Sequence, residues 1–195
     1  MTTLILVRHG ETDWNRDRRW QGQTDAPLNE RGRAQARALA DELAGEDVAA
    51  VYASDLSRAR ETAEIIAGRL GRAVDVDPRL REVHVGGWSG LTTAEIEARF
   101  PEDVSRWRSG DTSHAFDGGE TYADMGVRVV GALEEIAARH PGEQVLVVLH
   151  GGPIRALLAH AAGITYEEQR HRRDHLDNCG FVRVVVRDGV FTGID

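Results

Sequence analysis

The chain has 195 residues, with 24 basic and 32 acidic side chains and a formal net charge of −8 at pH 7. This length fits one domain with a good core, and the acidic balance argues against a protein that binds nucleic acid or anionic membranes, so we expect neither partner. Every basic residue is an arginine, which excludes Schiff-base chemistry and the lysine of a P-loop. One cysteine excludes an intramolecular disulfide, and no apolar run has the length of a transmembrane helix or the form of a signal peptide, so we expect a cytoplasmic protein.

The first predicted element is an apolar run over residues 4–7, typical of a strand buried on both faces. Arg8, His9 and Gly10 follow it, at the edge where open α/β sheets bind ligands. Arginine offers a rigid fork of donors to phosphate, and a neutral histidine is a nucleophile or base. By itself this is a weak signal, because an Arg-His pair at a strand end is more often a solvated cap.

Residues 13–28 are polar and show neither helical nor strand periodicity, so we expect a loop over the strand ends. Asn15 and Gln21 could donate amide hydrogens to a phosphoryl oxygen, or they could satisfy the loop backbone. Trp14 and Trp20 are expected to pack rather than to recognise a ligand.

Apolar periodicity and end signals predict further strands over 48–53 and 73–76 and helices over 30–43, 54–70, 93–100, 102–108, 122–140, 153–162 and 167–175. Ser54 or Asp55 should cap the helix that ends at Leu70. Arg58 then lies in the first turn of that helix, where a lone cation gains nothing from the helix dipole. An anion bound at this helix N-terminus would explain why an arginine stands at position 58.

Glu82 follows an arginine, and the simplest interpretation is an ordinary ion pair. Close to the crevice, with apolar neighbours such as Trp88, it could instead donate a proton to a leaving group. The longest irregular stretch, 109–121, contains three glycines. We expect it to belong to a helical and loop lid over about 93–122 that sets substrate choice.

A second apolar run, 145–149, ends in His150, Gly151, Gly152 and Pro153. Proline suits the first turn of a helix, so the glycine amides should form an anion site at the helix N-terminus. Two such strand-to-histidine junctions indicate that His9 and His150 face one crevice.

The C-terminal part contains His171 and His175 at the spacing of a zinc helix. Arg172 stands where a metalloprotease needs glutamate, so we expect surface histidines rather than a metal site. Strands over 181–186 and 190–192, joined by Asp188-Gly189 in a type I′ turn, should form an antiparallel edge.

If the candidate groups converge, two guanidinium groups and helix-end amides would hold a phosphate monoester and keep His9 neutral. His9 would attack phosphorus, with its other ring nitrogen held as N–H by a carbonyl such as that of Gly10. His150 would donate to the phosphoryl oxygens, and Glu82 would protonate the departing oxygen. Because the arginines neutralise the charge, the scheme needs no metal.

Five blocks in this order resemble the histidine phosphatase superfamily, in its phosphoglycerate mutase-like branch, over residues 4–180. The blocks are Arg8–Thr12 with Asn15, Gly22, Asp25, Pro27-Leu28 and Gly32; Ser54–Leu56 with Arg58-Ala59 and Thr62-Ala63; Glu82 with Gly86, Trp88 and Gly90; Gly118–Glu120; and His150–Gly152. The resemblance implies a three-layer α/β/α fold with a mostly parallel central sheet, an antiparallel edge strand and a lid, as a single domain over 1–195.

The resemblance also implies roles for the site. His9 is the expected phosphorylated nucleophile and Glu82 the proton donor, and the remaining implied phosphate-pocket residues are Arg8, Arg58, His150, Asn15, Gln21, Gly22 and Gly151. The chain departs from the family pattern at Val85, Thr121 and Leu149. None of these three positions carries a catalytic group, so the departures bear on substrate preference.

We therefore expect a phosphatase that hydrolyses small phosphorylated metabolites through a phosphohistidine, without metal or cofactor, as a monomer or homodimer. The alternatives are a 2,3-bisphosphoglycerate-dependent phosphoglycerate mutase and a non-catalytic sensor of a phosphorylated ligand. Similar mutases carry longer insertions after the proton donor and a C-terminal tail that closes the site, which favours hydrolysis here. Residues 79–96 also resemble a glucosyl-3-phosphoglycerate phosphatase.

Overall fold

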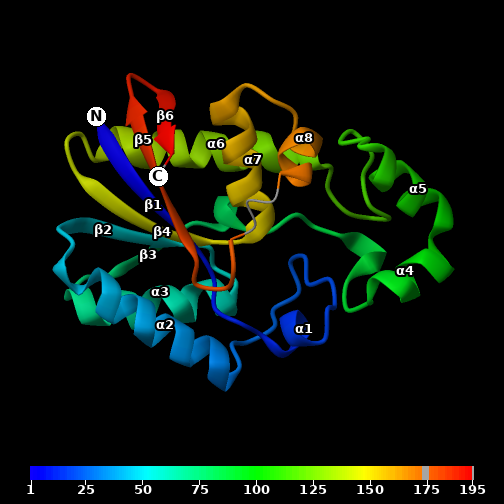
Figure 1. Cartoon of the computed structure of the whole chain (residues 1–195), viewed down its shortest axis with the longest axis horizontal. Coiled ribbons are helices and arrows are strands. Elements are labelled where there is room, and N and C mark those ends of the chain that lie inside the picture. Colours follow the sequence, from blue (N-terminus) through cyan, green and yellow to red (C-terminus); the bar gives the residue numbers. More distant parts are fainter. Residues whose placement is uncertain (173–175, 195) are drawn as a thin grey trace.

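The computed structural model describes residues 1–172 and 176–194. Its centre is a six-stranded sheet in the order β3-β2-β4-β1-β5-β6, with helices on both faces (Figure 1). The strands are β1 (Thr2–Arg8), β2 (Val48–Ala53), β3 (Val74–Val76), β4 (Gln144–Leu149), β5 (Phe181–Arg187) and β6 (Val190–Ile194). The helices are α1 (Asp13–Arg16), α2 (Glu30–Glu42), α3 (Ser57–Leu70), α4 (Thr93–Arg99), α5 (Pro101–Ser109), α6 (Tyr122–Arg139), α7 (Gly151–Ala162) and α8 (Tyr166–His171). Three 3₁₀ turns lie at Leu43–Gly45, Pro78–Leu80 and Gly86–Trp88.

The sheet is parallel from β3 through β2 and β4 to β1, and β5 and β6 run antiparallel at its other edge. The predicted mostly parallel sheet with an antiparallel edge is confirmed. Asp188 and Gly189 between β5 and β6 have φ of 51° and 77°, the two positive values that a type I′ turn requires.

Two hydrophobic cores lie on opposite faces of the sheet, and β1 contributes to both. Leu4 and Leu6 pack with the apolar faces of α6 and α7, whereas Ile5 and Val7 pack with those of α2 and α3. All four side chains are fully buried. This is why the first strand is a continuous apolar run rather than an alternating one.

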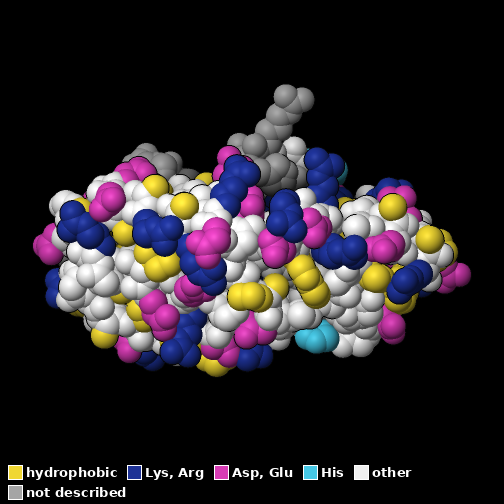
Figure 2. Space-filling model, turned by 90° about the horizontal axis from the view of Figure 1, so that it is seen from below, with side chains coloured by type: hydrophobic (Ala, Val, Ile, Leu, Met, Phe, Trp, Pro, Cys, Tyr) yellow, Lys and Arg dark blue, Asp and Glu magenta, His cyan; other side chains and the backbone are white. Residues whose placement is uncertain are grey.

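The face that carries α2 and α3 is covered by mixed charges (Figure 2). Ion pairs join Arg33 to Glu61 and Arg69 to Asp41 between these helices. Because acidic and basic groups alternate here, this face presents no extended region of one sign.

Two local predictions were wrong. The stretch 13–28 contains the single-turn helix α1, which begins with a capping box between Thr12 and Asn15. Helix α3 is not capped by Ser54 or Asp55, because the hydroxyl of Ser54 lies against His150 and the carboxylate of Asp55 pairs with Arg81. Instead, Asp25 accepts the amide hydrogen of Ser57 at 2.7 Å from the facing loop.

Helices α4 and α5 extend beyond the end of the sheet (Figure 1), and an irregular stretch over residues 110–121 leads from α5 to α6. The predicted irregular segment is therefore confirmed, and its role as a lid stays a prediction. The last predicted helix is shorter than expected: it ends at His171, which lies 2.6 Å from Glu167, and His175 lies outside the described residues. Among the residues described, no helix is long and apolar enough to cross a membrane.

Candidate active site

A crevice opens where β1 and β4 end side by side. The chain leaves β1 towards α2 on one face of the sheet and leaves β4 into α7 on the other face (Figure 1), the arrangement that opens a ligand crevice in α/β folds. The amide of His9 donates to the carbonyl of Leu149 at 3.0 Å, which holds the two strand ends together. A cavity of about 550 Å³ lies there, and its walls include eight of the nine predicted site residues: Arg8, His9, Asn15, Gln21, Gly22, Arg58, Glu82 and Gly151.

His9 is buried at the base of this cavity. Its Nδ1 lies 2.7 Å from the carbonyl oxygen of Gly10. Burial, followed by the charges of Arg58 and Arg8, holds the pKa of His9 well below its usual range. The imidazole is therefore neutral, and because a carbonyl only accepts, Nδ1 carries the hydrogen and Nε2 keeps a free lone pair.

His150, the ninth predicted residue, lies next to His9 rather than on the cavity wall. The two ring centroids are 5.1 Å apart, and the side chain of His150 is fully buried. Its Nε2 lies 2.9 Å from the hydroxyl of Ser54, whereas its Nδ1 has no hydrogen-bond partner among the described residues. Burial, and then the charge of Arg58, lowers the pKa of His150 well below its usual range, so this ring is neutral too.

Two arginines from different elements reach the cavity. Arg58, in the first turn of α3, donates to the carbonyls of Thr24 and Gly22 at 2.8 and 2.7 Å, and Arg8, at the end of β1, donates to that of Leu176 at 2.7 Å. In both side chains the buried Nε has no partner within the described part of the chain. Burial lowers the pKa of Arg58 to about 10, so it stays charged at neutral pH. Both guanidinium groups therefore keep a donor for an anion.

Thr12 orients the two amide side chains that the sequence indicated. The amide oxygen of Asn15 accepts from the backbone N–H of Thr12 at 3.1 Å. The amide oxygen of Gln21 lies 3.1 Å from the Thr12 hydroxyl. With both oxygens turned to Thr12, each side chain keeps an NH₂ group to donate to a ligand. Thr12 belongs to the predicted motif, but its contact with Gln21 could not be inferred from spacing.

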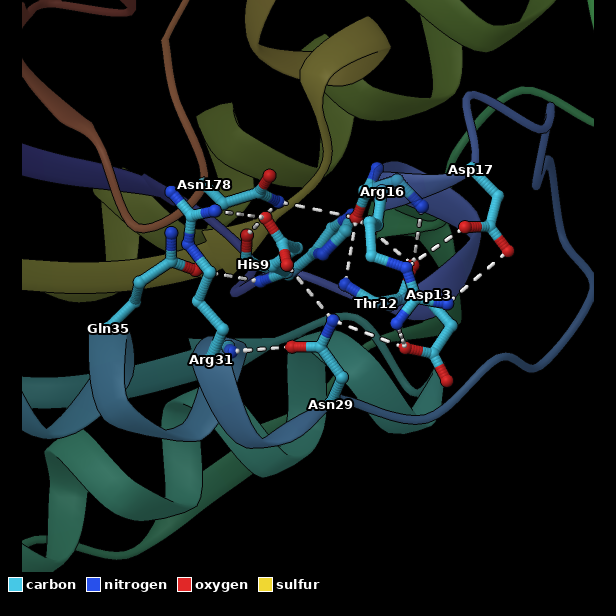
Figure 3. Close-up of polar contacts among 12 residues, drawn as sticks. His9, Thr12, Asp13, Arg16, Asp17, Asn29, Arg31, Gln35 and Asn178 are labelled. Atoms are coloured by element: carbon cyan, nitrogen blue, oxygen red, sulfur yellow. Dashed lines mark hydrogen bonds and ion pairs between the residues drawn. The ribbon is translucent and has the colours of Figure 1, made fainter.

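The backbone around His9 is held from two sides (Figure 3). The side chain of Asn178 donates to the carbonyl of His9 at 2.9 Å, and Gln35 of α2 accepts the amide hydrogen of Glu11 at 2.9 Å. Sequence analysis did not identify Asn178. Its only signal is its place before β5, because an antiparallel neighbour of β1 begins where β1 ends.

Glu82 lies on an irregular segment after β3, and both of its carboxylate oxygens accept backbone N–H groups. Oε1 accepts from Val83 at 2.9 Å, and Oε2 accepts from Gly152 in the first turn of α7 at 3.1 Å. A Cβ at position 152 would lie 2.1 Å from Oε1, so only glycine allows this approach. The ordinary ion pair with Arg81 is not formed, because Arg81 binds Asp55.

Comparison with known proteins assigns a family to nearly the whole chain. Residues 4–193 match the model of the histidine phosphatase superfamily (branch 1). The chain belongs to this superfamily. Phosphoserine phosphatase 1 of Hydrogenobacter thermophilus is 41% identical over 164 residues, which cover 84% of this chain and 78% of that protein. A probable phosphoglycerate mutase of Serratia proteamaculans is 39% identical over 189 residues, which cover 94% of this chain and 85% of that protein.

Solved structures agree with this assignment. A mycobacterial glucosyl-3-phosphoglycerate phosphatase in complex with VO₃ superposes with a TM-score of 0.88 at 35% identity, covering 99% of this chain and 97% of that one. The predicted fold and the predicted enzyme class, a phosphatase of the histidine phosphatase type, are confirmed.

The part of the cavity wall beyond the predicted site residues, called the outer wall here, combines aromatic, aliphatic and arginine side chains in this histidine phosphatase. Tyr122 and Tyr166 stack with ring centroids 4.3 Å apart, and Trp20 and Trp107 meet edge to face at 5.4 Å. Arg155 of α7 also lines it and donates to the Tyr166 hydroxyl at 3.2 Å. Sequence analysis assigned Trp20 to packing and did not single out the others, because they come from four different helices that only tertiary folding brings together.

Proposed function

We propose that this histidine phosphatase is a metal-independent phosphomonoester hydrolase that passes a phosphoryl group from a small metabolite to His9 and then to water. The observation that carries the proposal is a neutral imidazole with a free Nε2 lone pair, beside two charged arginines whose buried Nε groups lack partners in the described chain. Such a site attracts a phosphoryl group and offers it a nucleophile.

In the first step, Nε2 of His9 attacks phosphorus and the bond from phosphorus to the ester oxygen breaks. The departing oxygen takes the proton of the Glu82 carboxyl group, which gives an alcohol and a phosphohistidine. Arg8, Arg58 and the amides of Asn15 and Gln21 donate to the equatorial oxygens, where charge gathers. The Gly10 carbonyl keeps its hydrogen bond to Nδ1–H and stabilises the ring as it becomes cationic.

In the second step, a water molecule attacks the phosphohistidine and gives its proton to the Glu82 carboxylate. The bond from phosphorus to Nε2 breaks, inorganic phosphate leaves, and His9 regains its lone pair. His150 lies next to His9, and its Nδ1 has no partner in the described part of the chain, so it supplies a further hydrogen bond to the phosphoryl group. The arginines neutralise the charge that a magnesium ion covers in other phosphoryl-transfer enzymes.

The substrate class follows from the outer wall. Aromatic rings and three arginines (Arg19, Arg155 and Arg170) beyond the phosphoryl subsite favour a leaving group that is polar and larger than a simple alcohol. Relatives of this chain are named for phosphoserine and for glucosyl-3-phosphoglycerate. We therefore propose phosphorylated amino acids, phosphoglycerates and sugar phosphates as the substrates to compare.

The test is phosphate release from p-nitrophenyl phosphate and from this panel of metabolites, with EDTA present. Turnover that EDTA leaves unchanged and His9→Ala abolishes supports the proposal. Release from none of them, at acidic or neutral pH, contradicts it, and tight binding of a phosphorylated ligand without turnover would identify a sensor instead.

A mutase remains the second candidate, because the relative named as a probable phosphoglycerate mutase shares 39% identity over 94% of this chain. That activity would interconvert 2- and 3-phosphoglycerate and would need the bisphosphate. Isomerisation faster than phosphate release would replace hydrolysis as the assigned function.

A further inference from the structure

The segment that carries Glu82 has no regular secondary structure. Residues 81–85 form neither helix nor strand, so no ladder partners hold their backbone carbonyls. Partly buried carbonyls need donors. Gln23 donates to the carbonyl of Glu82 at 3.1 Å, and one side chain on a distant helix donates to three carbonyls between residues 79 and 82.

That side chain is Arg128 of α6. Its Nη1 donates to the carbonyls of Arg79 and Arg81, both at 2.8 Å, and its Nη2 donates to the carbonyl of Glu82 at 3.0 Å. The remaining donors go to the carboxylate of Glu120, from Nε at 2.7 Å and from Nη2 at 2.8 Å. All of the N–H groups that a guanidinium offers are therefore engaged.

Glu120 completes the arrangement from the other side. Besides binding Arg128, its carboxylate accepts the amide hydrogen of His84 at 3.2 Å, and its own amide donates to the carbonyl of His84 at 2.8 Å. The two side chains thus hold the backbone on both sides of Glu82. Neither lines the cavity, and the donors of Arg128 and both carboxylate oxygens of Glu120 are already engaged with the protein.

We propose that the Glu120–Arg128 pair positions the proton donor: it fixes the backbone of residues 79–84 so that the Glu82 carboxyl group meets the departing oxygen. The proposal rests on the proposed phosphatase activity. It also gives a role to the Gly118–Glu120 block of the family resemblance, because Glu120 is the acidic member of this pair. A fork of donors is needed because three carbonyls and a carboxylate are bound at once, which a lysine ammonium cannot do.

Two substrates with different leaving groups can distinguish the positioning of a proton donor from a general loss of structure. The kcat/KM of a phosphatase that forms a covalent intermediate reports on the step that releases the leaving group. That step needs a proton when the leaving group is an alkoxide and hardly needs one when it is p-nitrophenolate. Displacing Glu82 should therefore lower kcat/KM for glycerol phosphate and leave that for p-nitrophenyl phosphate nearly unchanged.

The experiment compares Arg128→Gln, Arg128→Lys and Glu120→Gln with the unaltered protein on these two substrates. We expect kcat/KM for glycerol phosphate to fall roughly tenfold to a hundredfold in Arg128→Gln, with a change below about threefold for p-nitrophenyl phosphate. For Arg128→Lys and Glu120→Gln, kcat/KM for glycerol phosphate should lie between the values for Arg128→Gln and the unaltered protein. Arg183→Gln, which breaks the partly buried pair between Arg183 of β5 and Glu46, is the control and should leave the ratio of the two kcat/KM values unchanged.

A double-mutant cycle with Glu82→Gln tests whether Arg128 acts through Glu82. Once the carboxyl group is gone, Arg128→Gln should cause no further loss on glycerol phosphate. An equal fall on both substrates, or additive losses in the cycle, overturns the proposal. If Arg128→Gln does not fold, the milder Glu120→Gln decides by the same ratio. If the unaltered protein releases no phosphate from either substrate, the proposed function itself fails.

Discussion

The Nδ1 atom of His9 lies 2.7 Å from the carbonyl oxygen of Gly10, its neighbour in the chain. This contact fixes the hydrogen on Nδ1, because the oxygen can only accept. Burial, and then the charges of Arg58 and Arg8, lower the pKa of His9 and so disfavour a second proton on the ring. The Gly10 carbonyl, burial and the two neighbouring arginines together keep Nε2 unprotonated before any substrate arrives.

A buried neutral His9 should make the folded state less stable in acid. Its pKa is lowered on folding, so below about pH 6.5 the unfolded chain takes up a proton that the folded chain does not. The free energy of unfolding should then fall by up to roughly 1.4 kcal/mol per pH unit on account of this ring. His9→Asn keeps an N–H for Gly10 and does not titrate, so its stability should fall less steeply. Urea unfolding of both proteins between about pH 7.5 and pH 5 measures the difference, and equal slopes would refute the neutral-ring assignment.

Arg58→Lys should disable the site although it keeps the positive charge. Arg58 binds two carbonyls, and its Nε has no partner among the residues that the structure describes, a geometry that an ammonium group cannot reproduce. We expect kcat/KM on p-nitrophenyl phosphate to fall about 10²- to 10³-fold. Arg60→Lys, an exposed position on the same helix, should leave it unchanged. If both substitutions changed kcat/KM by a similar small factor, the assignment of Arg58 to the phosphate pocket would be wrong.

Gly152→Ala should act on Glu82 rather than on the fold. The new methyl group would lie 2.1 Å from Oε1 and force the carboxylate away from the α7 N-terminus. We expect kcat/KM for glycerol phosphate to drop roughly tenfold or more, with a smaller effect on p-nitrophenyl phosphate. Gly131→Ala on α6, where a Cβ meets nothing within 4 Å, is the matched control. Full activity of Gly152→Ala on glycerol phosphate would contradict the placement of the proton donor.

The parts of the site that sequence predicts best are those at strand ends. His9 and His150 each follow an apolar run, and in a parallel sheet the carboxyl ends of such strands share one edge, so local pattern and topology suffice. The same holds for Arg58, whose place in a helix first turn is a short-range property.

The parts that sequence reasoning missed depend on contacts between distant segments. The sequence indicates Glu82 itself but not the residues that hold its backbone. These are Glu120 and Arg128, which come after two further helices, and no periodicity links them to Glu82. Helix α3 is capped by Asp25 from a facing loop because the local candidates bind elsewhere. The residues of the helix and those directly before it therefore could not reveal Asp25 as the acceptor for the first turn.

The most direct test of the central claim is to trap the phosphorylated enzyme. The protein is mixed with phosphorylated substrate, quenched within its first turnovers in alkali, which preserves a phosphorus–nitrogen bond, and mapped by mass spectrometry. Phosphate on His9, absent from His9→Ala and lost on acid treatment, is the predicted result. Phosphate on another residue, or none on His9 in an enzyme that turns over and in which His9→Ala stays active, would contradict it.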